Sequence, residues 1–179
     1  MKIRLSAIFL LIAFSVCGPG SAQVKQPIRS EQRHFSAEDT GVKKPVVIPD
    51  DVLAILAKDE RVRLTVEYEK PLDGKLPASW FSASAIHLSS PDKTDLVVVG
   101  VGPLLGANVT TFWIFSATPN GHELAMTAAA HDLIVKKTLW KGYREIEMSG
   151  ETAVEITRVQ YRWEGKQYVA YEETLEPIE

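Results

Sequence analysis

Four aromatic residues stand next to sequences that favour turns, and they are the first candidates for binding a ligand. They are Trp80, Phe81, Trp140 and Trp163. Trp140 and Trp163 each lie one residue before an X-Gly pair, so both are expected at strand ends. Aromatic side chains in such places can form a binding face for a sugar or a peptide, although core packing is the commoner use. We predict these four residues as ligand-binding, with core packing as the alternative.

Groups that could perform acid–base catalysis are spread along the chain. A hydrolase could use residues that converge only in the fold, drawn from His87, Asp92, Asp95, His131, Glu145 and Glu147. The sequence has no Gly-x-Ser-x-Gly signature for a serine nucleophile, and its histidines do not have the spacing of a common zinc site. We therefore assign no catalytic residue, no metal ligand and no cofactor, and keep a hydrolase as the alternative function.

The first 22 residues have the order of a secretory signal peptide. Two basic residues precede the apolar stretch Leu5–Cys17, and Gly20-Ser21-Ala22 then offers the small-x-small pattern of a cleavage site. Thirteen residues span roughly 20 Å as a helix, less than the ~30 Å hydrocarbon layer of a membrane. We expect cleavage near Ala22 and export to the periplasm or the cell exterior, rather than a transmembrane anchor. Lipidation of Cys17 is the less favoured alternative.

Charge and composition narrow the class of protein. The chain has 179 residues, with 20 Lys and Arg against 23 Asp and Glu, which excludes a basic nucleic-acid binder. A hydrophobic content of 45% suits one globular domain and excludes a wholly disordered chain. Cleavage after residue 22 would also remove the single cysteine, so the mature protein would contain no disulfide.

The sequence predicts a flexible linker, one short helix and then strands. Residues 23–45 contain few core residues and are predicted as the linker, and 46–179 as a single β-rich domain with a frayed acidic tail from Glu172. Ile48-Pro49-Asp50-Asp51 is typical of a helix start, and that helix should stop near Asp59. Over residues 61–69, apolar and polar side chains alternate, which favours a strand, with a helix as the alternative.

Regular apolar runs separated by glycine turns predict an antiparallel β meander. The runs cover residues 80–88, 96–99, 109–115, 123–130, 133–135, 143–148, 153–163 and 168–171. The fold class is mainly β, or β-rich α+β, arranged as a sandwich, an open barrel or a curled sheet. Continuously apolar Val97-Val98-Val99 should form a central strand covered on both faces. A change of phase predicts a β-bulge near Thr157-Arg158.

One hairpin resembles a known repeat. The stretch Phe81–Gly100, ending in Asp95-Leu96-Val97-Val98-Val99-Gly100, resembles the FG-GAP-like repeats of secreted and cell-surface β proteins. That resemblance implies a calcium-binding loop with Asp95, and Asp92 one place late, as its carboxylates. The later runs FWIF, GYREIEM and YRWEGKQY are similar to small uncharacterised exported bacterial domains, which implies export and a β fold.

These observations predict an exported, non-enzymatic binding or accessory domain of the bacterial cell envelope. Its partner would be an envelope protein or a glycan, with no nucleic acid and no transmembrane helix in the mature chain. Export, aromatic residues at strand ends and the lack of a catalytic motif favour this function over the hydrolase.

Overall fold

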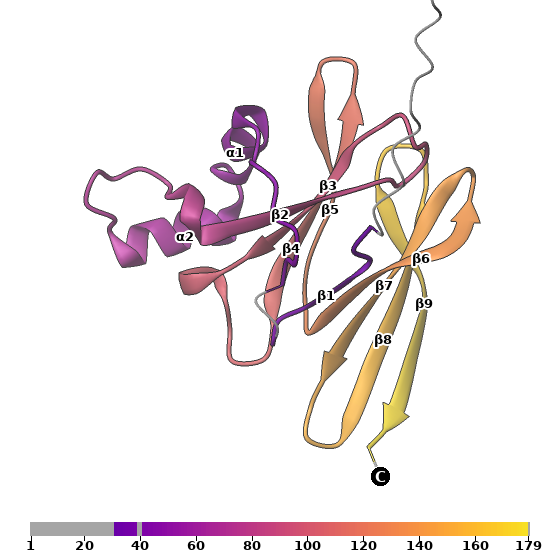
Figure 1. Ribbon diagram of the computed structural model, residues 1–179. Helices are drawn as coiled ribbons and strands as arrows, with labels where there is room; N and C mark the ends of the chain where they lie inside the picture. The colour runs from indigo at the N-terminus through magenta and orange to yellow at the C-terminus, as the bar shows by residue number, and fades with distance from the viewer. Residues whose placement is uncertain (1–30, 39–40, 179) are drawn as a thin grey trace, which may run out of the picture.

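Two antiparallel sheets form the body of the protein in the computed structural model, which describes residues 31–38 and 41–178. The five-stranded sheet has the order β1-β6-β7-β8-β9, and the four-stranded sheet has the order β2-β3-β4-β5. The strands are β1 (His34–Ser36), β2 (Phe81–Ile86), β3 (Asp95–Gly100), β4 (Thr110–Thr118), β5 (Gly121–Ala130), β6 (Asp132–Trp140), β7 (Tyr143–Glu151), β8 (Glu155–Trp163) and β9 (Tyr168–Pro177). Figure 1 shows the two sheets beside each other, with the helices next to the four-stranded sheet. The predicted mainly β, antiparallel fold is confirmed.

Local sequence accounts for the positions of the strands. Each of the eight predicted apolar runs overlaps one of the strands β2 to β9, in order. At the turn between β6 and β7, Lys141 and Gly142 have φ angles of 49° and 81°, and a type I′ hairpin turn requires positive φ at both positions. Strand β3 is buried along its whole length, as its apolar sequence predicts.

Side chains of the four-stranded sheet enter two different cores, because successive residues of a strand point to opposite faces. The core between the sheets includes Val97, Phe112, Ile114, Leu133 and Ile146. The second core lies under the helices α1 (Asp50–Leu56) and α2 (Glu60–Glu69), and includes Val52, Leu56, Val62, Val98, Trp113 and Phe115. The four-stranded sheet is therefore covered on both faces, and the helices are held by its outer face.

The strand predicted over residues 61–69 is wrong, because this segment is helix α2. The alternation of Val62, Leu64, Val66 and Tyr68 fits a strand, but it also contains two pairs at the i, i+4 spacing of a helix. Asp59 then begins the helix by accepting hydrogen bonds from the backbone N–H groups of Arg61 and Val62. Two α-helices are thus present in the described residues instead of the single one predicted, and α1 ends at Leu56.

Part of the predicted linker over residues 23–45 packs into the fold. Strand β1 pairs with β6, with Phe35 opposite Leu133, and the Phe35 side chain is only 1% exposed in the core between the sheets. Val42 is also buried in that core. The buried side chains of Phe35 and Val42 therefore anchor this segment. The predicted signal peptide and residues 23–30 lie outside the described residues.

Two further predictions at the C-terminal end need correction. The pairing of β8 with β7 is regular through Thr157 and Arg158, so the bulge is not there. It lies instead on β9, where Tyr171 is an extra residue in the pairing with β8. The acidic tail does not fray at Glu172, because β9 continues to Pro177 in register with β8.

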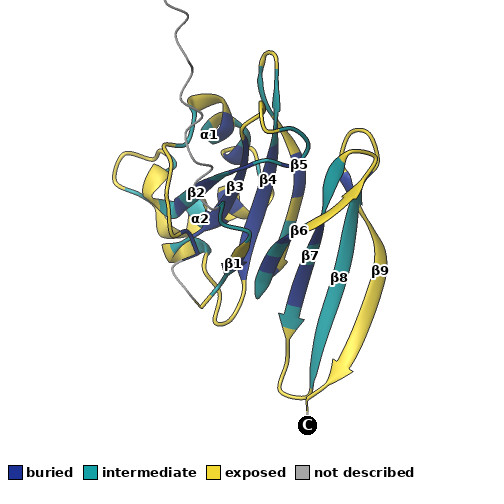
Figure 2. Cartoon of the chain, turned by 45° about the vertical axis from the view of Figure 1, so that its right-hand side comes forward, coloured by how far each residue is buried: buried dark blue, intermediate teal, exposed yellow. Residues whose placement is uncertain are grey.

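The hairpin of β8 and β9 is the least covered part of the five-stranded sheet. Figure 2 shows β8 as half-buried and β9 as exposed along almost its whole length, in contrast to the buried β3 and β4. Both faces of this hairpin are therefore accessible over much of its length. Among the described residues, no helix is long and apolar enough to cross a membrane.

Candidate functional site

Exposed apolar side chains lie on one side of helix α2 and on the loop beside it. Leu64 is 58% exposed and Tyr68, one turn further along the same side of the helix, is 84% exposed. Leu105 and Val109 in the loop that precedes β4 are also exposed, and both line the same hollow as Leu64. We call these four residues, together with the two hollows that Leu64 lines, the α2 surface. Large apolar side chains gathered in this way usually mark an interaction site.

Contacts with strand β4 hold α2 in place beneath this surface. The Oδ1 atom of Asp59 accepts the backbone N–H groups of Arg61 and Val62 at 3.0 and 3.3 Å. Its Oδ2 atom accepts the indole N–H of Trp113 at 2.9 Å. The guanidinium group of Arg61 donates to the hydroxyl of Thr111 at 3.0 Å. Val62 is fully buried against the sheet, so Leu64 and Tyr68 on the other side of the helix must face outward.

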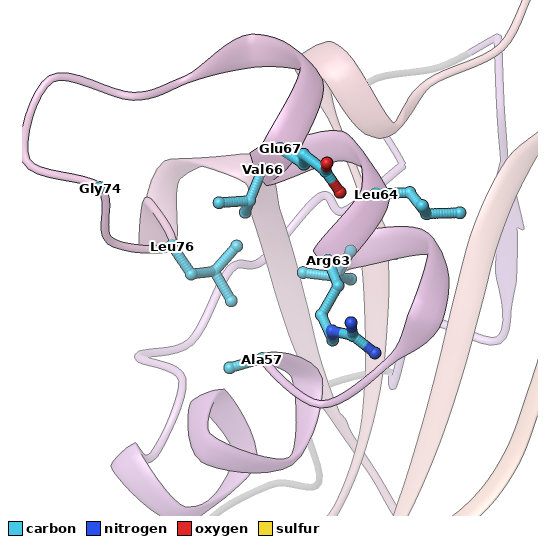
Figure 3. A pocket seen from close by; sticks show the side chains of 8 residues that line it. Ala57, Arg63, Leu64, Val66, Glu67, Gly74 and Leu76 are labelled. Atoms are coloured by element: carbon cyan, nitrogen blue, oxygen red, sulfur yellow. The ribbon is translucent and has the colours of Figure 1, made fainter.

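Two hollows flank Leu64. The first, of about 330 Å³, lies between α2, the end of α1 and the loop that leads to β2. Figure 3 shows Val66 and Leu76 facing each other across it, with Ala57 below and Leu64 on the far side of the helix. The second, of about 420 Å³, lies between α2 and the loop that contains Pro103, Leu105 and Val109. Leu64 is among the lining residues of both, so the two hollows lie on either side of α2.

Charged side chains border the first hollow without neutralising each other. Arg63 and Glu67 both line it, and their side chains make no hydrogen bond or ion pair within the described part of the chain. Residues 60–70 carry three acidic and three basic side chains, so the helix has no excess of either sign. A partner could therefore pair with both charges at the rim of an apolar contact.

The four predicted aromatic residues lie in three separate places. Phe81 is buried in the core under the helices, with its ring 5.6 Å from that of Trp113, and Trp80 packs against the same core. Trp163 is buried at the end of the core between the sheets, stacked on Tyr143 with ring centres 4.5 Å apart. The structure does not bring the four residues together on one face, and any ligand binding by them stays a prediction.

Trp163 and Trp140 do lie next to accessible space. Trp163 and Tyr143 line a hollow of about 210 Å³ at the end of the two sheets, with Lys93 and Lys166 at its margin. Trp140 is 38% exposed, but the guanidinium group of Arg162 lies 4.6 Å from the centre of its ring. That contact already occupies one face of the indole with a cation.

The six candidate acid–base residues do not converge either. His87 pairs with Glu31 at 3.2 Å, whereas Glu147 lies on β7 among Lys136, Arg158 and Gln160. Burial raises the pKa of Glu147, but the hydrogen bond from Gln160 and the charge of Lys136 outweigh burial and lower the pKa. A carboxylate held ionised in this way is unsuited to act as a general acid. None of the three hollows described above is lined by any of the six residues.

His131 belongs to a separate cluster at the corner between β5 and β6. Its two ring nitrogens lie 3.2 Å from Asp132 and 3.5 Å from Glu38, and Asp132 also lies 3.1 Å from His34. Burial lowers the pKa of His131, but the bonds to Asp132 and Glu38 outweigh burial and raise it. Burial raises the pKa of Asp132, but hydrogen bonds from Ser36, His131 and His34 lower it overall. The cluster ties β1 and the residues after it to β6.

The two carboxylates of the calcium-loop resemblance have different environments. Asp95 is fully buried, and its oxygens accept the backbone N–H groups of Leu88 and Ala117, both at 2.8 Å. These bonds give Asp95 a structural role that joins the loop after β2 to the end of β4. Asp92 is exposed. Among the described residues, no three His, Cys, Asp or Glu side chains are placed to hold a metal ion together.

The α2 surface was missed from the sequence because Leu64 and Tyr68 were assigned to a strand. The available signal was Asp59 three residues before Val62, which is typical of a helix N-cap, followed by the i, i+4 pairs at 62/66 and 64/68. Comparison with family models, curated proteins and solved structures found no match.

Proposed function

We propose that this chain is an exported, non-enzymatic binding domain of the cell envelope, and that it binds a partner polypeptide at the α2 surface. The observation that carries the proposal is the exposure of Leu64 and Tyr68 on α2, a helix with hollows of about 330 and 420 Å³ on either side. A fold that buries an apolar core elsewhere gains nothing from exposing these side chains to water.

The shape of the α2 surface favours a polypeptide over a small molecule. Sites for small ligands usually enclose most of the ligand's surface. Here the two hollows lie on either side of α2, so a ligand that occupies both must extend across the helix. A segment with apolar residues spaced along it can place one residue in each hollow and extend over Tyr68.

The charges of α2 argue against a lipid surface. Helices that bind anionic membranes carry an excess of Lys and Arg on their polar face. Residues 60–70 have three acidic and three basic residues, and Arg63 and Glu67 border the first hollow with no partner in the described chain. A partner protein that carries one charge of each sign suits this rim better than a membrane does. A glycan has less support, because Tyr68 is the sole aromatic side chain of the α2 surface.

Site-specific cross-linking tests the partner. A photoreactive amino acid placed at position 64 in cells should give one discrete adduct with another protein, whereas the same group at position 139 should not. Leu139 is the matched control, because it is 61% exposed but lies on β6. When the photoreactive group is at position 64, the additional substitution Tyr68→Lys should abolish the adduct. Tyr68 is exposed, so this substitution should leave folding unchanged.

The outcomes separate the possible occupants. An adduct of twice the mass of the chain would show that a second copy covers α2, and would overturn the proposed hetero-association. The same adducts from positions 64 and 139, or none from either, would also contradict it. Mass spectrometry of the adduct identifies a partner only when Tyr68→Lys removes it.

Fractionation of cells tests the proposed export. The mature protein should be recovered outside the cytoplasm with Gln23 as its first residue, because cleavage is proposed after Ala22. A cytoplasmic protein that begins at Met1 would refute export. A lipid-modified protein that begins at Cys17 would keep export but would replace the cleavage site.

A further inference from the structure

A second binding surface lies at the open edge of the five-stranded sheet. We propose that β9 accepts an extended basic segment of a partner polypeptide as an additional antiparallel strand. The pairing would cover residues 172–177, beyond the extra residue Tyr171. This edge belongs to the five-stranded sheet, whereas α2 packs on the four-stranded sheet, so the proposal goes beyond the function proposed above.

The edge of β9 is long and open. It is the last strand in the order β1-β6-β7-β8-β9, and it runs for ten residues. From Val169 to Pro177 every residue of β9 is exposed, as Figure 2 shows. Backbone N–H and C=O groups along such an edge are free to pair with another strand.

The charge of the edge decides which strand can pair with it. Strand β9 contains Glu172, Glu173 and Glu176 and no Lys or Arg. Glu176 pairs with Arg158 at 3.2 Å, whereas the side chains of Glu172 and Glu173 make no ion pair within the described part of the chain. An added strand would meet this row of acids directly.

A second copy of the same edge fits poorly. Two β9 strands from identical copies could pair antiparallel about a centre of symmetry anywhere between residues 172 and 174. In each of these registers, a glutamate of one copy lies opposite or next to a glutamate of the other; the residues concerned are Glu172, Glu173 and Glu176. Like charges directly across two strands are destabilising. The acids therefore guard β9 against edge-to-edge pairing of identical copies, and favour a strand that carries Lys or Arg.

The register of β9 with β8 specifies the pattern of that strand. Glu172 and Glu176 lie opposite Gln160 and Ile156 on one face of the sheet, and Glu173 lies opposite Val159 on the other. An incoming strand should place basic residues opposite all three acids and an apolar residue opposite Leu175. Antiparallel to residues 176 to 172, that pattern is Lys-Val-Thr-Arg-Lys.

The test uses a synthetic peptide with this pattern at its centre and NMR spectra of the protein. The peptide should shift the amide signals of residues 172–177 and leave those of residues 60–70 unchanged. A peptide with Glu in place of each basic residue should cause no shift. The variant Glu172→Gln/Glu173→Gln/Glu176→Gln should bind the basic peptide about tenfold more weakly or worse, because three cross-strand charge pairs are lost. Raising the salt concentration should weaken binding to the unmodified protein.

A control with the same change in charge makes the result specific. The variant Asp73→Asn/Asp92→Asn/Glu123→Gln changes three exposed acids away from β9 and should bind the peptide as the unmodified protein does. Sedimentation gives an independent measurement, since the β9 variant should associate at concentrations where the control stays monomeric. Equal peptide affinity for both variants, or shifts confined to α2, would overturn the proposal. Because the cross-linking experiment reports on α2 alone, either proposal can fail without the other.

Discussion

Substitutions of Asp59 should separate two roles of a single carboxylate. One oxygen caps α2 by accepting the N–H groups of Arg61 and Val62, and the other accepts the indole N–H of Trp113 at 2.9 Å. Alanine removes both sets of bonds. Asparagine has one carbonyl oxygen, so it can keep the cap or the bond to the indole, but not both.

The expected magnitudes follow from these contacts. Loss of an N-cap costs about 1 kcal/mol, and a hydrogen bond to a charged group contributes about 1.5–3 kcal/mol. Asp59 is only half-buried and borders a hollow of about 190 Å³, so its carboxylate keeps contact with water, and we place the loss of its bond to the indole near the lower limit. We therefore expect Asp59→Ala to lower the free energy of unfolding by about 2–3 kcal/mol, and Asp59→Asn by about 1 kcal/mol.

Urea unfolding in a second background tests the assignment. In protein that carries Trp113→Phe there is no indole N–H, so Asp59→Asn should cost nothing further and Asp59→Ala only the cap, about 1 kcal/mol. The slope of the unfolding free energy with urea should stay constant across the series. If Asp59→Asn costs the same with and without Trp113→Phe, the carboxylate does not couple α2 to β4 and the explanation of the helix position is refuted.

Four further effects should be measurable on the same purified protein. Phe35→Ala should lower the unfolding free energy by about 3–5 kcal/mol, as measured in urea, because it empties a core site that anchors β1. Gly121→Ala should lower the melting temperature, since φ is 127° there and the added Cβ would lie 2.6 Å from Oδ2 of Asp51. The pKa of Asp132 is lowered from 3.8 in the folded state, so the ionised carboxylate stabilises the fold above pH 3.8 and this contribution should disappear as the pH falls through the lowered value. When the urea midpoint is plotted against pH, Asp132→Asn should therefore reduce its fall at acid pH. The pKa of His131 is raised from 6.5, so its contribution to the free energy of unfolding is complete below pH 6.5 and is lost as the pH rises through the folded value. If His131→Gln leaves the fall of the urea midpoint on the alkaline side unchanged, this explanation is contradicted.

The strands could be predicted because their signals are local. Alternation along a strand and a glycine in a two-residue turn depend on neighbours only a few positions away, as at Lys141-Gly142. The same reasoning failed at residues 61–69, where the pattern satisfied the helix and strand periods equally. Asp59 carried the local information that distinguishes them, through its cap on α2.

The candidate sites depended on contacts between distant parts of the chain. Val62 packs in the same core as Trp113, which lies some fifty residues later in the chain. Because that side of α2 faces the core, Leu64 and Tyr68 on the opposite side are exposed. The predicted aromatic residues dispersed for the same reason, since Phe81 and Trp163 entered different cores. Residue type alone does not say which core a side chain will enter.

By itself the sequence determined the fold class and the places of β2 to β9 along the chain, because backbone conformation responds to neighbours along the chain. Tertiary structure alone decided that Phe35 closes a core through β6 and that Asp95 is a buried acceptor and not an open ligand. It also decided that β9 is an acidic edge. The exposure of a side chain depends on what packs against it, and that partner lies elsewhere in the sequence.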